Sequence, residues 1–232
     1  MTQSSTPAQL PADEQRRLSE LRRYNVLNTP PAPSLDLLTR LAARIFHAPI
    51  SLVSLVDANR LWFKSRQGIE VTETPRHLSF CTHAILGDEV MVVTDATSDT
   101  RFADYSLVRG LPHVRFYAGA PLRSPSGHNL GTLCIMDQKP RDLSREEQGV
   151  LAGLSKLVID ELELQLKILE LNDEAERLRL TEESAQRALV RLEELQYGQI
   201  AEHLADELTK MREIHHFPRT ALPSPWPDSS RS

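Results

Sequence analysis

Two cysteines and one histidine carry the chemistry that stands out most in this chain. Cys81, His83 and Cys134 offer two thiols and an imidazole, which are soft ligands for a metal ion such as zinc. Cys-X-His is not a usual zinc spacing, however, and a fourth ligand is not evident. The two thiols would sense redox state if their sulfurs lay within disulfide reach. Simple packing inside the core is the third interpretation, because buried free cysteines behave as small apolar residues.

Other catalytic patterns do not emerge from the sequence. We find no Ser–His–Asp or Cys–His pair with a supporting pattern and no glycine-rich phosphate loop. One segment is densely charged, with Asp95, Asp99, Arg101, Asp104 and Arg109. Its simplest interpretation is a solvated loop with local salt bridges. We therefore predict that the chain is not an enzyme and has no catalytic residues.

An antiparallel sheet is predicted to position the two thiols. Residues 115–137 hold two apolar runs separated by Ser124-Pro125-Ser126-Gly127, which has the composition of a tight turn, so the segment reads as a hairpin. Alternate residues from Leu130 to Met136, Cys134 among them, share one face of the second run. The residues between them share the other face. Both faces are mostly apolar, so we expect both to be covered.

The rest of the first 143 residues predicts short strands and helices. Strands are expected at 50–56, 61–66 and 91–94, and helices at 13–26, 35–46 and 80–86. Asp13 and Ser34 are the expected N-caps of the first two helices, and Pro30, Pro31 and Pro33 separate these helices. The fold class is therefore α+β, with a mostly antiparallel sheet of five or six strands flanked by helices.

A long helix follows the sheet. Ser144 and Glu147 fit a capping box at its start, and no proline interrupts the chain from there to Pro218. Apolar residues recur every seven positions, which predicts a parallel dimeric coiled coil; they are Leu157, Leu164, Leu171, Leu178, Ala185 and Leu192. The partner positions include Leu154 and are interrupted by Glu161 and Glu182. The repeat slips near residues 196–200, where Gly198 is a weak point. A solvated single helix is the alternative.

Composition sets further expectations about location and partners. The formal net charge of −5 argues against nucleic acid or an anionic membrane as a partner. No apolar run is long enough to cross a bilayer, and the first residues lack the pattern of a secretory signal. Two cysteines are too few for a disulfide framework. We therefore expect a cytoplasmic protein with reduced thiols.

Five segments together resemble the GAF domain, in the version that precedes bacterial histidine kinases and diguanylate cyclases. They are LRRYNVLNTPP (21–31), SLVSLVDANRLWFKSRQG (51–68), TPRHLSFCTHAI (74–85), VTDATSDTRFADYSLV (93–108), and RFYAGAPL with GTLCIMDQKPR (115–141). The resemblance implies a central antiparallel sheet flanked by helices. It also implies that the first and last helices form a dimer-mediating bundle.

The resemblance further implies a ligand pocket on one face of the sheet, although the sequence identifies neither a ligand nor a cofactor. The candidate pocket residues are Trp62, Phe80, Cys81, His83, Tyr117, Thr132 and Cys134. Core packing is the competing interpretation for each of them. Covalent bilin binding would use a cysteine, as in GAF photoreceptors, but the rest of that pattern is not recognisable. The motif of cyclic-nucleotide GAF domains is not evident either.

The C-terminal end carries a second resemblance. LTKMREIHH (208–216) is similar to the start of a histidine kinase phosphoacceptor helix, which places His216 at the phosphorylated position. The following residues, from Phe217 to Thr220, depart from that pattern, and Pro218 would stop the helix. We therefore expect the sensor half of a kinase, truncated after His216.

These observations lead to one interpretation and two alternatives. We expect a disordered segment (1–12), a GAF sensor domain (13–163), a signalling coiled coil (164–216) and a disordered tail (217–232). The module would relay a small ligand or redox state through a parallel homodimer to a kinase or cyclase output. The alternatives are a cysteine-dependent enzyme similar to GAF-type methionine sulfoxide reductases, and a dimerisation module that binds nothing.

Overall fold

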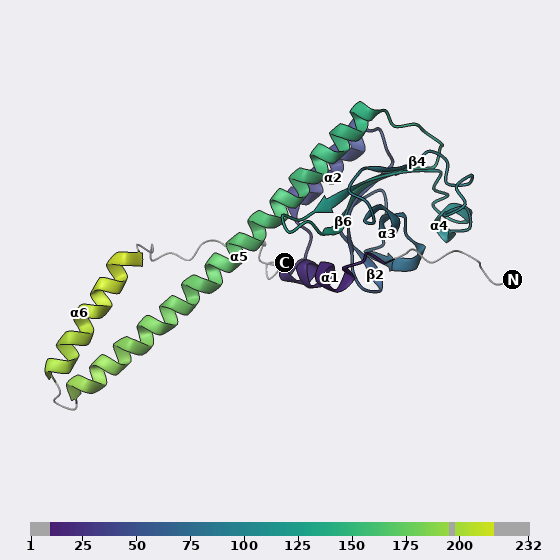
Figure 1. Ribbon diagram of the computed structural model, residues 1–232. Coiled ribbons are helices and arrows are strands. Elements are labelled where there is room, and N and C mark those ends of the chain that lie inside the picture. Colours follow the sequence, from purple (N-terminus) through teal and green to yellow (C-terminus); the bar gives the residue numbers. More distant parts are fainter. Residues whose placement is uncertain (1–9, 195–197, 216–232) are drawn as a thin grey trace. The chain divides into compact units, whose positions relative to one another are not determined.

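The computed structural model describes residues 10–194 and 198–215 (Figure 1). The C-terminal tail, His216 and most of the expected N-terminal tail lie outside the described residues, so the predictions for them stay predictions. The chain divides into two compact units, Met1–Leu164 and Gln165–Ser232. The first unit holds the sheet and both cysteines, and each unit is described by itself.

Two helices open the first unit. Helix α1 spans Glu14–Arg23 and α2 spans Pro33–Ile45. Pro33 is the first residue of α2, where the backbone N–H that proline lacks would have no partner within the helix. The N-cap position predicted for Asp13 is confirmed, and the one predicted for Ser34 is wrong. Asp13 holds the N-cap position of α1 but makes no capping hydrogen bond, because its carboxylate pairs with His128 at 2.8 Å. Ser34 lies inside α2, where its hydroxyl donates to Glu161 at 2.7 Å.

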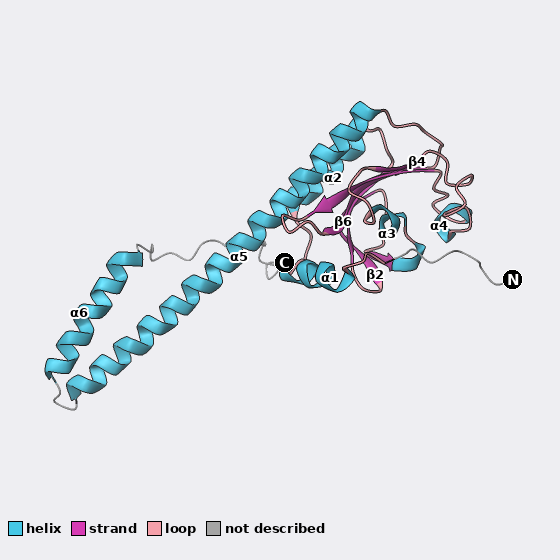
Figure 2. Cartoon of the chain, in the orientation of Figure 1, coloured by secondary structure: helices cyan, strands magenta, loops and turns pink. Residues whose placement is uncertain are grey.

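Six antiparallel strands form one sheet (Figure 2). They are β1 (Ile50–Val56), β2 (Arg60–Gln67), β3 (Glu73–Pro75), β4 (Met91–Val93), β5 (Phe116–Arg123) and β6 (Asn129–Asp137). Their order across the sheet is β3-β2-β1-β6-β5-β4. The predicted α+β class and the central β5–β6 hairpin are therefore confirmed. The short strand β3 was not predicted, since residues 68–80 show no clear period.

The two faces of the sheet are both covered, as the sequence predicts. In β6 the residues Leu130 to Met136 are all buried. One face packs against the short helices α3 (Phe80–Ala84) and α4 (Ser106–Arg109). A 3₁₀ helix η1 (Arg76–Leu78) contacts β2. The other face meets the helices α1, α2 and α5 (Figure 1). Burial on both faces explains why β6 reads as a nearly continuous apolar run.

Helix α5 (Arg145–Glu194) follows the sheet, and helix α6 (Gly198–His215) follows α5. The predicted capping box is present: Ser144 N–H donates to Glu147 Oε2 at 2.8 Å, and Glu147 N–H donates to Ser144 Oγ at 3.2 Å. Residues 195–197, between the two helices, lie outside the described residues, so the prediction of one long helix with a weak point at Gly198 stays a prediction. Among the described helices, none is long and apolar enough to cross a membrane.

Hydrogen bonds tie the first part of α5 to the rest of the first unit. Ser155 Oγ donates to the Pro121 carbonyl of β5 at 3.2 Å. Glu163 accepts a hydrogen bond from the Tyr24 hydroxyl, at the end of α1. Apolar side chains complete this interface, with Leu151, Val158 and Leu162 all buried. The predicted seam residue Leu154 is also buried within the unit. The prediction that it faces a second helix of a coiled coil is therefore wrong for this end of α5.

Candidate functional site

The two cysteines lie against each other in the core of the first unit. Cys81 Sγ and Cys134 Sγ are 3.9 Å apart, and both thiols are free. The N-cap of α3 sets the position of Cys81, because Ser79 Oγ accepts a hydrogen bond from Cys81 N–H at 3.1 Å. Cys134 comes from β6, where it is the direct cross-strand partner of Gly119 and of Leu52. The fold thus brings together two thiols that are 53 residues apart in sequence.

Tyr117 places a phenol beside this pair. Its hydroxyl donates to Cys81 Sγ at 3.5 Å, and its ring stacks on Phe80 with centroids 5.0 Å apart. Gly119 leaves the space for this arrangement, since a Cβ there would lie 2.1 Å from the Tyr117 hydroxyl. A larger residue two positions along β5 would therefore push the phenol away from the thiols.

Two further hydroxyls face the same pair. Ser54 and Thr132 are direct partners across β1 and β6 and lie on the sheet face of Cys134, two residues along the strand. Both hydroxyls are fully buried and have no hydrogen-bond partner among the described residues. Each lowers the pKa of Cys81, because a hydroxyl this close to the sulfur favours its ionised form. A buried hydroxyl without an acceptor is unfavourable, and a Cys81 thiolate would supply one.

The site favours ionisation of one thiol rather than both. The hydrogen bond from Cys134 lowers the pKa of Cys81, and the donors Thr132, Tyr117 and Ser54 add to this effect against burial, which raises it. The same hydrogen bond, together with burial, raises the pKa of Cys134 well above that of an ordinary thiol. Burial raises the pKa of Tyr117 as well, so its phenol stays protonated and keeps its donor. The pair can therefore hold one thiolate and one thiol.

Five of the seven predicted pocket residues meet at this point, and two do not. Phe80, Cys81, Tyr117, Thr132 and Cys134 surround the thiol pair. His83 instead hydrogen-bonds the Tyr105 hydroxyl at 3.0 Å, at the half-buried edge of the core. Burial lowers the pKa of His83, and the nearby Arg101 adds to this.

Trp62 lies on the opposite face of the sheet. Trp62 pairs with Leu55 of β1 and therefore shares its face of the sheet. Leu55 is three residues from Leu52, so it lies on the face opposite to Leu52 and its partner Cys134. The sequence suggested Trp62 because it is aromatic, a criterion that does not reveal which face a strand residue occupies. Sequence reasoning also missed Ser54 and Gly119. A serine inside an otherwise apolar strand was the available signal for Ser54.

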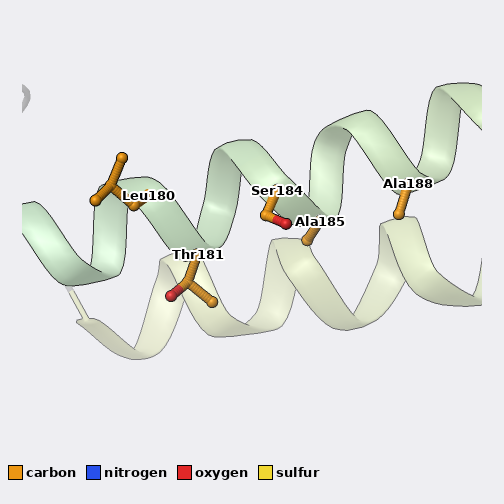
Figure 3. Close-up of a pocket in the computed structure, with 5 residues that line it drawn as sticks. All are labelled: Leu180, Thr181, Ser184, Ala185 and Ala188. Atoms are coloured by element: carbon orange, nitrogen blue, oxygen red, sulfur yellow. The ribbon is translucent and has the colours of Figure 1, made fainter.

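The surroundings of the two thiols are closely packed. Within the described ranges, no three His, Cys, Asp or Glu side chains cluster closely enough to hold a metal ion. Side chains from α3, the sheet and the 94–115 connection fill the space where a GAF ligand was expected. A shallow hollow lies on α5 and is lined by Leu180, Thr181, Ser184, Ala185 and Ala188 (Figure 3). These side chains carry no ionisable group.

The charged segment forms local pairs, as its simplest interpretation predicted. Arg101 and Asp99 lie 2.6 Å apart, and Arg109 pairs with Asp104. Asp95 accepts a hydrogen bond from Thr97 N–H at 2.9 Å. These side chains form hydrogen bonds and ion pairs within their own segment, and none of these contacts involves the thiols.

Comparison with known proteins identifies the family to which this fold belongs. The family model described as GAF domain matches residues 31–162. A cyclic di-GMP phosphodiesterase of Pseudomonas aeruginosa is 39% identical over 150 residues, which are 64% of this chain and 26% of that protein. The chain therefore spans about a quarter of the length of this curated relative. The match contradicts the prediction that the chain is not an enzyme: a relative is named as one, so lack of a recognisable catalytic motif does not exclude activity.

Solved structures with similar folds share little sequence with the chain. The GAF domain of an Acinetobacter phosphoenolpyruvate-protein phosphotransferase is 18% identical, with a TM-score of 0.47, covering 64% of this chain and 93% of that one. A type II free methionine-R-sulfoxide reductase from Thermoplasma acidophilum is 14% identical, with a TM-score of 0.47, covering 55% of this chain and 89% of that one. At these TM-scores neither structure supports an inference about function.

Proposed function

The chain belongs to the GAF domain family, and from this premise we propose that it is the sensory part of a dimeric regulator of cyclic di-GMP turnover. The observation that carries the proposal is the 39% identity, over 150 residues, to a protein named a cyclic di-GMP phosphodiesterase. The expected kinase-type output rests on the resemblance of residues 208–216. The residue at its phosphorylated position, His216, lies outside the described residues, so we favour the cyclic di-GMP output. The cytoplasmic location stays a prediction that accompanies this proposal.

An exposed apolar stripe supports the dimer. On α5, Val150, Leu157 and Leu164 recur every seven residues and are 41%, 52% and 57% exposed. On α2, Leu37 and Leu41 are one turn apart and exposed as well. The hydrogen bond from Ser34 of α2 to Glu161 of α5 brings the two helices together. Large exposed apolar patches mark interaction surfaces, and a seven-residue repeat suits a second copy of the same helix.

The contacts of α5 supply a route from the sheet to this stripe. Val158 and Leu162 pack against the domain, and Ser155 holds the Pro121 carbonyl of β5. Leu157 and Leu164 lie on the outer side of the same helical turns. A shift of β5 therefore moves the side chains that the second copy would contact. A signal changes such an equilibrium only by its differential interaction with the two packings.

The first experiment measures subunit number by size-exclusion chromatography with light scattering. The full chain is expected at twice its mass of 26.2 kDa, and Leu157→Glu/Leu164→Glu at the single-chain mass, because two charges per chain would be buried in the dimer. Val71→Glu is the matched control, since Val71 is 59% exposed in the β2–β3 connection and should leave the dimer intact. A monomeric wild-type chain would contradict the proposal.

The second experiment measures cellular cyclic di-GMP by mass spectrometry in a bacterial host that expresses the chain. We expect the level to fall, in line with the name of the relative, and to stay at the empty-vector value with Leu157→Glu/Leu164→Glu. A parallel assay with purified chain and cyclic di-GMP separates direct hydrolysis from control of a host enzyme. Equal levels in cells with wild-type chain and with empty vector would refute the cyclic di-GMP output.

A further inference from the structure

We propose that Cys81 and Cys134 form a peroxide-reactive thiol pair that closes to a disulfide, and that this closure is the input signal of the module. The claim about the pair rests on the geometry of the core alone. The claim about the input rests on the proposed function, and the experiments below keep the two apart.

The distance between the sulfurs is the first argument. They are 3.9 Å apart as thiols, and a disulfide requires about 2.05 Å. The sulfurs must therefore approach by about 1.8 Å, which side-chain rotation and a small shift of the five-residue helix α3 can supply. The chain holds no other cysteine, so within one chain each thiol has a single possible partner.

The polar surroundings of Cys81 are the second argument. A pair that only fills space would be lined by apolar groups, as the rest of this core is. Here the Tyr117 hydroxyl donates to Cys81 Sγ, and the hydroxyls of Ser54 and Thr132 are fully buried with no partner among the described residues. One hydroxyl that already donates and two buried hydroxyls that lack an acceptor favour a thiolate at Cys81, which is the nucleophilic form of cysteine.

The closed surroundings select the oxidant. Cys81 is 2% exposed and Cys134 is 0% exposed, and aromatic rings cover them, with Phe80 stacked on Tyr117 and lying 4.5 Å from Phe102 between ring centroids. A bulky disulfide such as oxidised glutathione cannot reach these sulfurs. Hydrogen peroxide is neutral and little larger than water, so it can enter through local opening of the short helix α3.

The chemistry balances with hydrogen peroxide as the only co-reactant. The Cys81 thiolate attacks one peroxide oxygen, the O–O bond breaks, and the departing hydroxide takes up the proton that Cys81 lost, giving water and a sulfenic acid on Cys81. Cys134 then attacks the Cys81 sulfur. The S–S bond forms, the S–O bond breaks, and the hydroxide leaves with the Cys134 proton as a second water. Two electrons pass from the sulfurs to the peroxide.

Closure would reach the strands that hold α5. Cys81 follows Phe80 directly, so a shift of α3 moves the ring that stacks on Tyr117. Closure also removes the sulfur acceptor of the Tyr117 hydroxyl. Tyr117 lies on β5, four residues before Pro121, whose carbonyl accepts the hydrogen bond from Ser155 of α5. The thiol pair is thus linked to α5 through one strand.

Intact mass spectrometry of the full chain tests the pair. Native protein treated with hydrogen peroxide should lose two hydrogens, and proteolysis should yield one linked peptide pair containing Cys81 and Cys134. The Cys134→Ser variant should stop at a sulfenic acid on Cys81, which dimedone traps. Wild-type protein that keeps both thiols free, or that links two chains instead, would overturn the proposal.

Two comparisons test the roles of the hydroxyl and of the closed core. Tyr117→Phe should slow disulfide formation about tenfold, the cost of losing one hydrogen bond to a charged sulfur. Tyr105→Phe is the matched control, because its phenol hydrogen-bonds His83 rather than a thiol; equal rates for the two variants would refute the donor role. Oxidised glutathione should leave the native mass unchanged, and an adduct would refute the selection of a small oxidant.

The input role is tested separately in cells. The effect of the chain on cyclic di-GMP should change after peroxide exposure, and Cys134→Ser should remove this dependence. A disulfide that forms without changing that effect would overturn the input role alone. A chain that never alters cyclic di-GMP would overturn the proposed function while the mass-spectrometric result on the pair stands.

Discussion

Replacement of Glu14 by glutamine should make the first unit both less stable and less sensitive to acid. Glu14 of α1 accepts hydrogen bonds from Arg17 at 2.8 Å and from Arg76 at 2.5 Å. Both arginines are buried, and Arg17 also donates to the Val56 carbonyl of β1 at 2.7 Å. Glutamine keeps the shape of the side chain but supplies no charge, so two buried guanidinium groups lose their counter-ion.

The pKa of Glu14 sets the size of the effect. Burial raises this pKa, but hydrogen bonds and charges from Arg17 and Arg76 outweigh it and lower the value from 4.5 to about 2. Each pH unit between the folded and unfolded values is worth about 1.36 kcal/mol. The carboxylate is 14% exposed, so after allowance for solvent screening it contributes about 2–3 kcal/mol at pH 7.

The pH dependence follows from the direction of that shift. A carboxyl group whose pKa is lower in the folded state stabilises the fold fully above its unfolded pKa, here 4.5. The stabilisation is lost as the pH falls from there toward about 2. About two-fifths of it should be gone at pH 3.5. The difference in stability between wild type and Glu14→Gln should therefore be constant from pH 7 to 5.5 and shrink at lower pH.

Urea denaturation followed by circular dichroism, repeated from pH 7 to pH 3.5, measures this difference. Glu146→Gln is the matched control, because Glu146 is an exposed glutamate in the first turn of α5 and its loss should change stability by less than about 0.5 kcal/mol. A gap between wild type and Glu14→Gln that stays the same at every pH would refute the assignment of the acid sensitivity to Glu14.

Two further predictions concern packing and capping. Gly119→Val should destabilise the domain by about 1–3 kcal/mol, because its Cβ would meet the Tyr117 hydroxyl; thermal unfolding measures this, and an unchanged melting temperature would show that the phenol has room to move. Ser144→Ala should cost about 1 kcal/mol by removing the cap shared with Glu147, measured by denaturant unfolding, and Ser144→Asp should restore most of it.

Short-range patterns in the sequence predicted much of the fold. The turn at residues 124–127, the alternation along β6 and the capping box at Ser144 depend on neighbours within a few positions, and the structure has all three. The side chains of the two expected N-caps make long-range contacts instead of capping hydrogen bonds. Asp13 and Ser34 have partners at His128 and Glu161, which no local pattern contains.

The candidate site was predictable in its residue types but not in its geometry. Cys81 and Cys134 stood out as thiols, yet their contact depends on packing α3 against β6. Side chains along β2 point to alternate faces of the sheet, and Trp62 lies on the face opposite to the thiols. The pairing of β2 with β1 also shifts by one position between Val53 and Ser54. Such an irregularity leaves no clear trace in composition, so the face of a single aromatic residue there could not be inferred.

Burial of both native thiols also makes the chain convenient for spectroscopy. A cysteine introduced at an exposed position such as Gln186 of α5 would be the accessible thiol toward a bulky maleimide or nitroxide reagent. Cys81 and Cys134, at 2% and 0% exposure, would remain unlabelled without being replaced. One spin label per chain would then report the spacing between the two α5 helices of the proposed dimer by double electron–electron resonance, with both native thiols left in place.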